Sequence, residues 1–371
     1  MKRWLPVLLI IGLIMILLAG CSGASGDSNL ETAEQFESPS PGSVDSSSSD
    51  SPESPGTSPG SSNDSGTVTG TGILEHQTDS EAAPVVYMTS AISPEGLMAA
   101  YEALGRTPSG NVAVKIHTGE GENSFNLKPD FIKELVQLVD GTIVECNTAY
   151  GGSRASTALH MQVAKDRGYT DIASVDIMDA DGGFEIPVVG GTRLTTNQVG
   201  ANFVNYDFFV VLSHFKGHAM GGFGGALKNM SIGIASSEGK SLIHSAGAET
   251  TGYGRNTPSE AFTESMAEAA KSVNDYLDNG NNLLYINVMN NISVDCDCSA
   301  NPAQPDMHDI GILASLDPVA LDQACVDLVY AAPDSSSVIQ RIESRKGIHI
   351  LEHAEAIGFG SREYRLVNLD D

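Results

Sequence analysis

Basic residues are scarce in this chain. Its 371 residues include 20 lysines and arginines against 47 aspartates and glutamates, which gives a formal net charge of −27. Nucleic-acid binding needs a basic face that neutralises phosphates, so the composition argues against a nucleic-acid partner. A small anionic ligand would have to be held by a local cluster of lysine and arginine side chains.

Cysteines and the short motifs of common enzyme classes are also scarce. Five cysteines in a chain of this length do not make a scaffold that depends on disulfides. No Gly-x-Ser-x-Gly elbow occurs in the part of the chain rich enough in apolar residues to form a core, which leaves a serine hydrolase without support. With 41% apolar residues, the chain can nevertheless form an ordinary hydrophobic core.

The N-terminus has the pattern of a secretory signal. Lys2 and Arg3 precede an apolar run over residues 5–18, and Leu18-Ala-Gly-Cys21 follows. This segment resembles a bacterial lipobox, in which Cys21 becomes the lipidated first residue of the mature protein. An uncleaved anchor is the alternative, but the run is shorter than the ~20 residues of a membrane span. We expect residues 1–21 to be a lipoprotein signal. The mature protein would then lie in the cell envelope, outside the cytoplasm, with the lipid bilayer as a partner.

Residues 22–83 consist mainly of Ser, Gly, Pro, Thr and acidic residues. Such a segment has too little apolar surface to offset its loss of conformational entropy on folding. The sequence therefore predicts a disordered acidic linker over residues 22–83 and a single folded domain over residues 84–371.

Within that domain, short apolar runs alternate with segments of helical periodicity. Strands are predicted at Val85–Met88, Val112–Ile116, Thr142–Glu145, Ile172–Ile177, Phe208–Leu212, Leu283–Val288 and Ile310–Ala314. The intervening helices begin at Ser93-Pro94, Pro129, Ser156, a capping box over residues 257–260, and Asp317-Pro318. This order is typical of an α/β fold with a mainly parallel sheet covered by helices on both faces.

Ligands of open α/β sheets bind beyond the carboxyl ends of the strands. Five of the predicted strands are followed there by polar residues, among them Ser315 and Asp317 after the last strand. We expect the five ends to meet at one edge of the sheet. The candidate catalytic residues are His117, Glu120, His214, Lys216 and His218. The candidate ligand-binding residues are Lys115, Asn147, Arg154, Gly222, Gly224, Gly225, Lys228, Asn229 and Lys240.

The segment over residues 213–229, SHFKGHAMGGFGGALKN, carries the densest set of these groups. It lacks the third glycine of a dinucleotide fingerprint and the flanking residues of a P-loop, so nucleotide binding has little support. Glycines allow the backbone to approach a ligand closely, and its amides with Lys216 and Lys228 could bind a phosphate or carboxylate. A tightly packed turn with solvated lysines is the alternative.

Metal binding is a further interpretation. His214, His218, Cys296 and Cys298 could bind a divalent ion such as Zn²⁺ or Fe²⁺ if the fold joins their loops. Cys296 and Cys298 form Cys-x-Cys rather than the Cys-x-x-Cys of zinc ribbons. Three alternatives to metal binding remain: free thiols, a disulfide between these two cysteines, and histidines that only donate hydrogen bonds.

These residues together resemble the domain of unknown function 362 family. The matching segments are VKIHTGE at 114–120, NTAYGGSR at 147–154, SHFKGH at 213–218, GFGGALKN at 222–229, Gly239-Lys240 with His244, DCDC at 295–298 and DIGILASLDP at 309–318. Many members look like iron–sulfur proteins because they carry a ferredoxin-like cysteine segment. This chain has no cysteine between His244 and Tyr285, so we do not expect an iron–sulfur cluster.

The resemblance implies no activity, because the family has none assigned. From the residues we expect an enzyme-like domain, tethered to the membrane, whose pocket binds a metal or a small anion. The alternative is a lipoprotein without catalytic activity that captures a small molecule and presents it to a membrane partner.

Overall fold

A computed structural model describes residues 74–371 except residues 253 and 255. The predicted signal with Cys21, and residues 22–73 of the predicted linker, lie outside the described residues. Among those described, no helix combines the length and the hydropathy that crossing a bilayer requires. The first described residues contact the rest of the domain. For example, the backbone N–H of His76 donates to Asp327 at 3.0 Å. Ordered contacts thus begin before the predicted boundary at residue 84.

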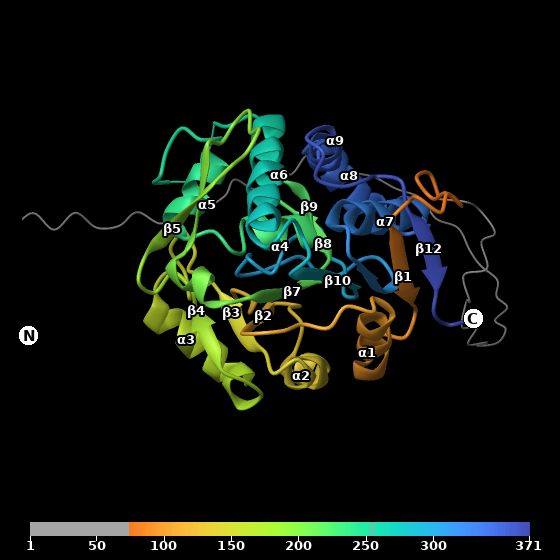
Figure 1. The fold of residues 1–371 in the computed structure, drawn as a ribbon, viewed down its shortest axis with the longest axis horizontal. Coiled ribbons are helices and arrows are strands. Elements are labelled where there is room, and N and C mark those ends of the chain that lie inside the picture. The colour runs from red at the N-terminus through yellow and green to blue at the C-terminus, as the bar shows by residue number, and fades with distance from the viewer. Residues whose placement is uncertain (1–73, 253, 255) are drawn as a thin grey trace, which may run out of the picture. The chain divides into compact units, whose positions relative to one another are not determined.

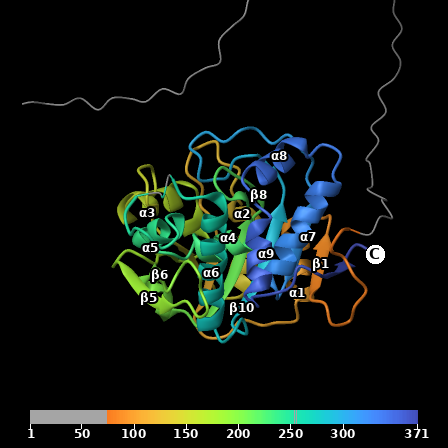
Figure 2. The same cartoon turned by 90° about the horizontal axis from the view of Figure 1, so that it is seen from above.

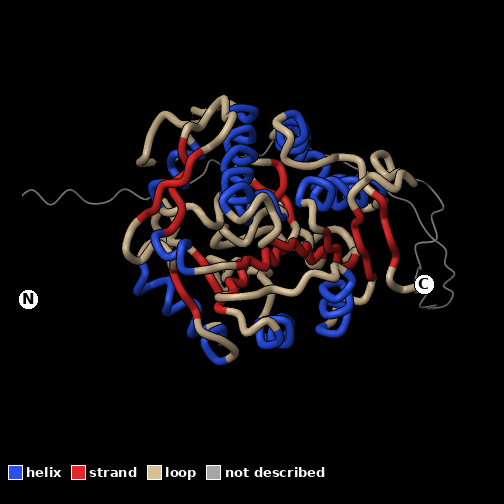
Figure 3. Tube along the Cα trace, viewed as in Figure 1, coloured by secondary structure: helices blue, strands red, loops and turns tan. Residues whose placement is uncertain are grey.

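Eight strands form the central sheet, in the order β12-β1-β11-β10-β7-β2-β3-β4 (Figure 3). Their bounds are β1 Val85–Thr89, β2 Val112–Lys115, β3 Thr142–Glu145, β4 Val175–Ile177, β7 Phe208–His214, β10 Leu283–Met289, β11 Gly311–Ser315 and β12 Arg365–Asn368. Strands β2, β7, β10 and β11 are buried along their whole length, as their continuous apolar runs predict. The mainly parallel sheet predicted from the sequence is confirmed.

Only β11 runs against its neighbours in this sheet of the described domain. It pairs antiparallel with both β1 and β10, whereas every other pair is parallel. A parallel connection needs a crossover, usually a helix, and residues 290–310 between β10 and β11 contain none. The chain therefore turns back at the edge where β10 ends.

The described helices cover both faces of this sheet (Figure 1). They are α1 Pro94–Ala103, α2 Pro129–Leu138, α3 Thr157–Asp166, α4 Ala226–Ser231, α5 Ser237–His244, α6 Ser259–Tyr276, α7 Pro318–Ala331, α8 Ser336–Ser344 and α9 His349–Ala356, with short 3-10 turns at Tyr169–Asp171 and Ala201–Asn205. Helices α1, α2 and α3 pack on one face around Leu97, Ile132 and Ala164. The others pack on the opposite face, where α6, α9 and α7 lie side by side (Figure 2).

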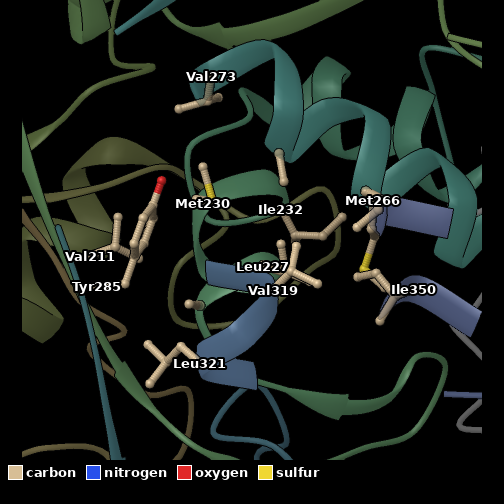
Figure 4. Packing of buried hydrophobic residues seen from close by; sticks show 14 of the residues in the cluster. Val211, Leu227, Met230, Ile232, Met266, Val273, Tyr285, Val319, Leu321 and Ile350 are labelled. Atoms are coloured by element: carbon tan, nitrogen blue, oxygen red, sulfur yellow. The ribbon is translucent and has the colours of Figure 1, made fainter. Parts of the chain in front are cut away.

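The larger of the two cores lies between the sheet and helices α4, α6, α7 and α9 (Figure 4). Val211 and Tyr285 project from the sheet toward Leu227 and Met230 of α4. These two buried side chains of α4 therefore help to fix this short helix against the sheet, in contact with β7. The position of α4 matters because Lys228 lies on it.

Two features of local structure differ from the prediction. Helix α6 begins at Ser259 and its N-cap is Pro258, which makes no side-chain hydrogen bond, so the predicted capping box is wrong. Thr257 lies one residue too early to cap. The described domain also contains two small hairpins that the apolar pattern does not reveal: β5 Gly183–Pro187 with β6 Thr196–Gly200, and β8 Lys216–His218 with β9 Gly222–Gly224.

Candidate functional site

Four of the five strand ends expected at one edge are found there. Strands β10, β7, β2 and β3 are parallel neighbours, so the residues that follow them share an edge of the sheet. The expectation is wrong for β11, which is antiparallel. Ser315 pairs with Tyr285 near the start of β10, at the opposite edge. Asp317 caps α7 there by accepting from Val319 and Ala320.

A cavity of about 210 Å³ lies at the shared edge. Most of the candidate residues line it: His117, Arg154, His214, Lys216, His218, Gly224, Gly225, Lys228, Asn229, Lys240 and Cys298. The others are not part of its lining: Lys115, Glu120, Asn147, Gly222 and Cys296. Segments far apart in the chain therefore meet around one small internal space.

Asp297 connects three of these segments. Its carboxylate accepts from Lys216 Nζ at 2.7 Å and from His214 Nδ1 at 2.9 Å, and its backbone oxygen accepts from the N–H of Glu120 at 2.7 Å. Burial opposes ionisation of this carboxyl, but the adjacent charges of Lys216 and His214 outweigh it and hold the pKa of Asp297 well below its usual value. Asp297 thus fixes the Cys-x-Cys loop against β7 and the β8–β9 hairpin.

Both ring nitrogens of His214 are engaged. Nδ1 faces the Asp297 carboxylate and Nε2 lies 2.6 Å from the backbone oxygen of Asn290. Both partners are acceptors, so both nitrogens donate, an arrangement that only the protonated imidazole satisfies. No lone pair of His214 is then available for a metal ion.

His117 and His218 are arranged differently from His214. Nδ1 of His117 accepts from the N–H of Gly119 at 3.0 Å, and Nδ1 of His218 accepts from the N–H of Gly221 at 2.9 Å. Burial, reinforced by Arg154 near His117 and by Lys228 near His218, keeps the pKa of each ring well below its usual value. A neutral ring that accepts at Nδ1 carries its proton on Nε2. Each histidine therefore offers an N–H donor at the cavity rather than a metal-binding lone pair.

Glu145 forms a second buried ion-pair network beside the cavity. It accepts from Lys115 Nζ at 3.0 Å, from the backbone N–H of Thr118 at 2.7 Å, and from Arg154 Nη1 at 3.4 Å. Burial opposes its ionisation, but Lys115 and the other neighbours outweigh burial, and the pKa of Glu145 lies well below its usual value. Glu120 accepts from Arg154 Nε at 2.9 Å and so holds the guanidinium in place from outside the cavity.

Lys228 is the exception among the basic groups at the cavity. Lys216 pairs with Asp297, Arg154 with Glu120, and Lys240 Nζ donates to the backbone oxygen of Ala235 at 2.6 Å. Lys228 Nζ makes no hydrogen bond or ion pair with any residue in the described part of the chain. Burial, together with the charges of Lys216, Arg154 and Lys115, lowers the pKa of Lys228 to about 7.

The glycine-rich segment acts mainly through packing. A Cβ at Gly225 would lie 2.3 Å from Asp322 Oδ1, whose carboxylate accepts from the backbone N–H groups of Ala226 and Leu227. The first amides of α4 are thus already occupied by a side chain of the same chain and do not form the expected anion nest. Gly222 has φ +82° and contacts Gly347, so the tight turn into β9 requires glycine.

The remaining candidates have structural contacts. Asn229 Nδ2 donates to the backbone oxygens of Lys115 and Leu212, which ties α4 to β2 and β7. Asn147 donates through Nδ2 to Thr157 Oγ1 at 3.0 Å. Both amides therefore position the cavity walls.

Cys296 and Cys298 form a disulfide, one of the alternatives that the sequence left open. Their sulfurs and a ring nitrogen of His218 all lie within 4.8 Å of one another, so this group could hold a metal ion if the thiols were reduced. His214, also predicted as a ligand, is not part of the group. Metal binding by the four predicted residues together is therefore not what this geometry offers.

Several lining residues were not among the candidates: Glu145, Ser213, Tyr150 and His244. Glu145 could have been found, because a carboxylate that ends a short buried strand needs a partner in the interior. His244 follows Gly239-Lys240 in the segments that resemble the family, and the packing of α5 brings it to the cavity. Its Nδ1 donates to the backbone oxygen of Lys240, and burial lowers its pKa to about 4.

Comparison with known families settles the relationship that these motifs indicate. The family model described as Domain of unknown function (DUF362) matches residues 112–327, which contain all four converging strands and the whole cavity. The chain belongs to the DUF362 family. A comparison with curated proteins found no match.

Comparison with solved structures found similarity over part of the chain, of which two examples follow. The lactate racemase apoprotein from Thermoanaerobacterium thermosaccharolyticum is 17% identical, with a TM-score of 0.33 over 54% of this chain and 50% of the other. A protein from Thermotoga maritima is 12% identical, with a TM-score of 0.36 over 63% of this chain and 57% of the other. The matches thus span only about half of each of those chains.

Proposed function

We propose that this DUF362 domain binds a small anionic molecule, a carboxylate or a phosphate, in the 210 Å³ cavity. One observation carries the proposal: Lys228 brings a basic group without a partner among the described residues to a cavity whose other basic groups each donate to an acceptor of the protein. A partly buried charge without a partner is unfavourable, and an anionic ligand would supply the missing counter-charge.

The neutral histidines support the same proposal. The Nε2–H groups of His117 and His218 have no partner in the described residues and are free to donate to oxygen atoms of a ligand. Basic groups at the cavity outnumber the carboxylates of Glu145 and Asp297, although the whole chain is strongly acidic. The local field therefore favours an anion where the overall charge does not.

The lipobox at Cys21 supports a location outside the cytoplasm, with the domain anchored to the membrane, as part of this proposal. Measurements of turnover and of ligand affinity on variants of Lys228 and His218 distinguish an enzyme from a receptor without catalytic activity. Loss of turnover with retained affinity indicates a catalyst, whereas loss of affinity alone indicates a receptor.

Replacing Lys228 by methionine tests anion binding. Hydrogen bonds to charged groups contribute about 1.5–3 kcal/mol, so we expect the affinity for oxalate or inorganic phosphate to fall at least about tenfold. Isothermal titration calorimetry on the full chain gives the affinity, and the rise in melting temperature with each anion gives a second readout. Lys271, which pairs with Asp275 on α6, provides the matched control. K271M should bind within about twofold of the parent chain; equal affinity in K228M would contradict the proposal.

A second candidate function is binding of a thiophilic divalent metal by His218, Cys296 and Cys298. The grouping of their ligand atoms within 4.8 Å supports it. Two changes are required: the disulfide must be reduced to thiolates, and His218 must give up its hydrogen bond with Gly221 or its Nε2 proton. Thiolate and imidazole ligands are those that Zn²⁺ prefers.

The metal candidate predicts a dependence on redox state. After reduction and removal of the reductant, the full chain should compete with a chromophoric chelator for about one equivalent of Zn²⁺, whereas the oxidised chain should not. C298S should lose this binding, whereas C325S, which changes a buried cysteine in α7, should keep it. Equal binding by the reduced parent and C298S would exclude the site.

A further inference from the structure

The chemistry available to Lys228 goes beyond that of a fixed positive charge. Its amine reaches the cavity without an acidic partner, whereas Lys115, Lys216 and Lys240 are each held by an acceptor. An ammonium hydrogen-bonded to a carboxylate has no lone pair to react. A partly buried amine beside other cationic groups favours its neutral form and is nucleophilic toward carbonyl groups.

The approach to this amine is also built into the fold. Lys228 lies on α4, and a Cβ placed at Gly224 would lie 3.0 Å from Lys228 Cδ. The lysine stem therefore packs over a position without a side chain, which directs it along the wall of the cavity. The ring of His218 lies close enough to Lys228 to be affected by its charge. The charges of His244, Lys216 and Arg341 also act on this ring.

We propose that Lys228 forms an imine with the carbonyl group of a small oxo acid, such as glyoxylate or pyruvate, bound in the cavity. The inference deepens the proposed function and rests on it, because the carboxylate of the oxo acid is the anion that the cavity would hold. The volume of about 210 Å³ suits a molecule of this size rather than a nucleotide or a long acyl chain.

The step conserves electrons and releases water. The Nζ lone pair of Lys228 attacks the carbonyl carbon, and the electrons of the C=O π bond move to oxygen, which takes a proton. That proton comes from the nitrogen, and His218 Nε2–H, at the cavity, donates a hydrogen bond to the oxygen. The remaining proton of the nitrogen goes to the hydroxyl group, which leaves as water when the C=N bond forms. No oxidant or reductant takes part.

Borohydride trapping tests the inference. The full chain is incubated with glyoxylate or pyruvate and sodium borohydride, which reduces an imine to a stable secondary amine. We expect one adduct per chain in the intact mass and its location at Lys228 in the peptide map. K228R, which keeps the charge but lacks the reactive amine, should lose the adduct. K271R, which changes a lysine paired with Asp275 on α6, should keep it.

The outcomes separate this inference from the proposed function. Adducts spread over surface lysines, or an adduct of equal yield in K228R, would overturn the imine. Oxalate has no ketone or aldehyde and reports anion binding alone. If oxalate raises the melting temperature but neither oxo acid is trapped, the imine is wrong and anion binding stands. If oxalate and both oxo acids leave the melting temperature unchanged and no adduct forms, both are wrong. The peptide map of the parent chain decides the site even if K228R folds poorly.

Discussion

Replacing Asp297 by asparagine is expected to lower the free energy of unfolding of the domain at pH 7 by about 3–5 kcal/mol. The buried carboxylate accepts from Lys216 Nζ at 2.7 Å and from His214 Nδ1 at 2.9 Å. An amide leaves both cationic groups without a counter-charge in an interior where water cannot replace it. Urea denaturation followed by circular dichroism measures the loss.

Asp295, two residues away in the same loop, provides the control. Its carboxylate pairs with Arg341 at 3.1 Å, but both side chains are partly exposed. Exposed pairs contribute about 1 kcal/mol or less, so D295N should lose much less than D297N. Similar losses in the two variants would mean that burial of the Asp297 network contributes little to stability.

The affinity for an anion should depend on the ionisation of Lys228. Burial, together with the charges of Lys216 and Arg154, lowers its pKa to about 7. The ammonium form attracts an anion and the neutral amine does not. Since the ammonium fraction falls tenfold per unit above the pKa, we expect the affinity for oxalate to fall roughly 100-fold between pH 6 and pH 9. Titration calorimetry across this range measures it.

The other charged groups that face Lys228 do not explain such a profile. Lys115, Lys216, Arg154 and Asp297 are held in ion pairs. The pKa of His218 is well below its usual value, and that of His244 is about 4, so neither changes its charge in this range. The fall in oxalate affinity between pH 6 and pH 9 should therefore be lost in K228M and retained in K271M. A slope that persists in K228M would assign the titration to a different group.

Much of the fold could be predicted from local sequence. The bounds predicted for β3, Thr142–Glu145, are those observed, and Asp317 caps α7 as expected. Buried strands between helices are recognisable because they are short, continuous and apolar. The two small hairpins are not, because glycine-rich segments such as β8 and β9 bury little apolar surface of their own.

The direction of β11 could not be predicted from the apolar pattern of the strand. Its apolar run is the same whichever way it pairs, so the sequence around Ile312 and Leu313 cannot distinguish a parallel strand from an antiparallel one. The absence of a helix between β10 and β11 was the only local indication. One reversed strand places Ser315 and Asp317 at the far edge and removes them from the site.

The family, the parallel strands β2, β3, β7 and β10, and the imidazole, ammonium and thiol groups that follow them can all be recognised in the amino-acid sequence. Which of these groups neutralise one another depends on how the chain folds. Lys216 and Lys228 look alike in the glycine-rich segment, yet Lys216 meets Asp297, a residue 81 positions away, and Lys228 meets no acid in the described chain. The energy of a buried charge depends on the groups within a few ångströms of it, and those groups come from loops that only the folded sheet brings together.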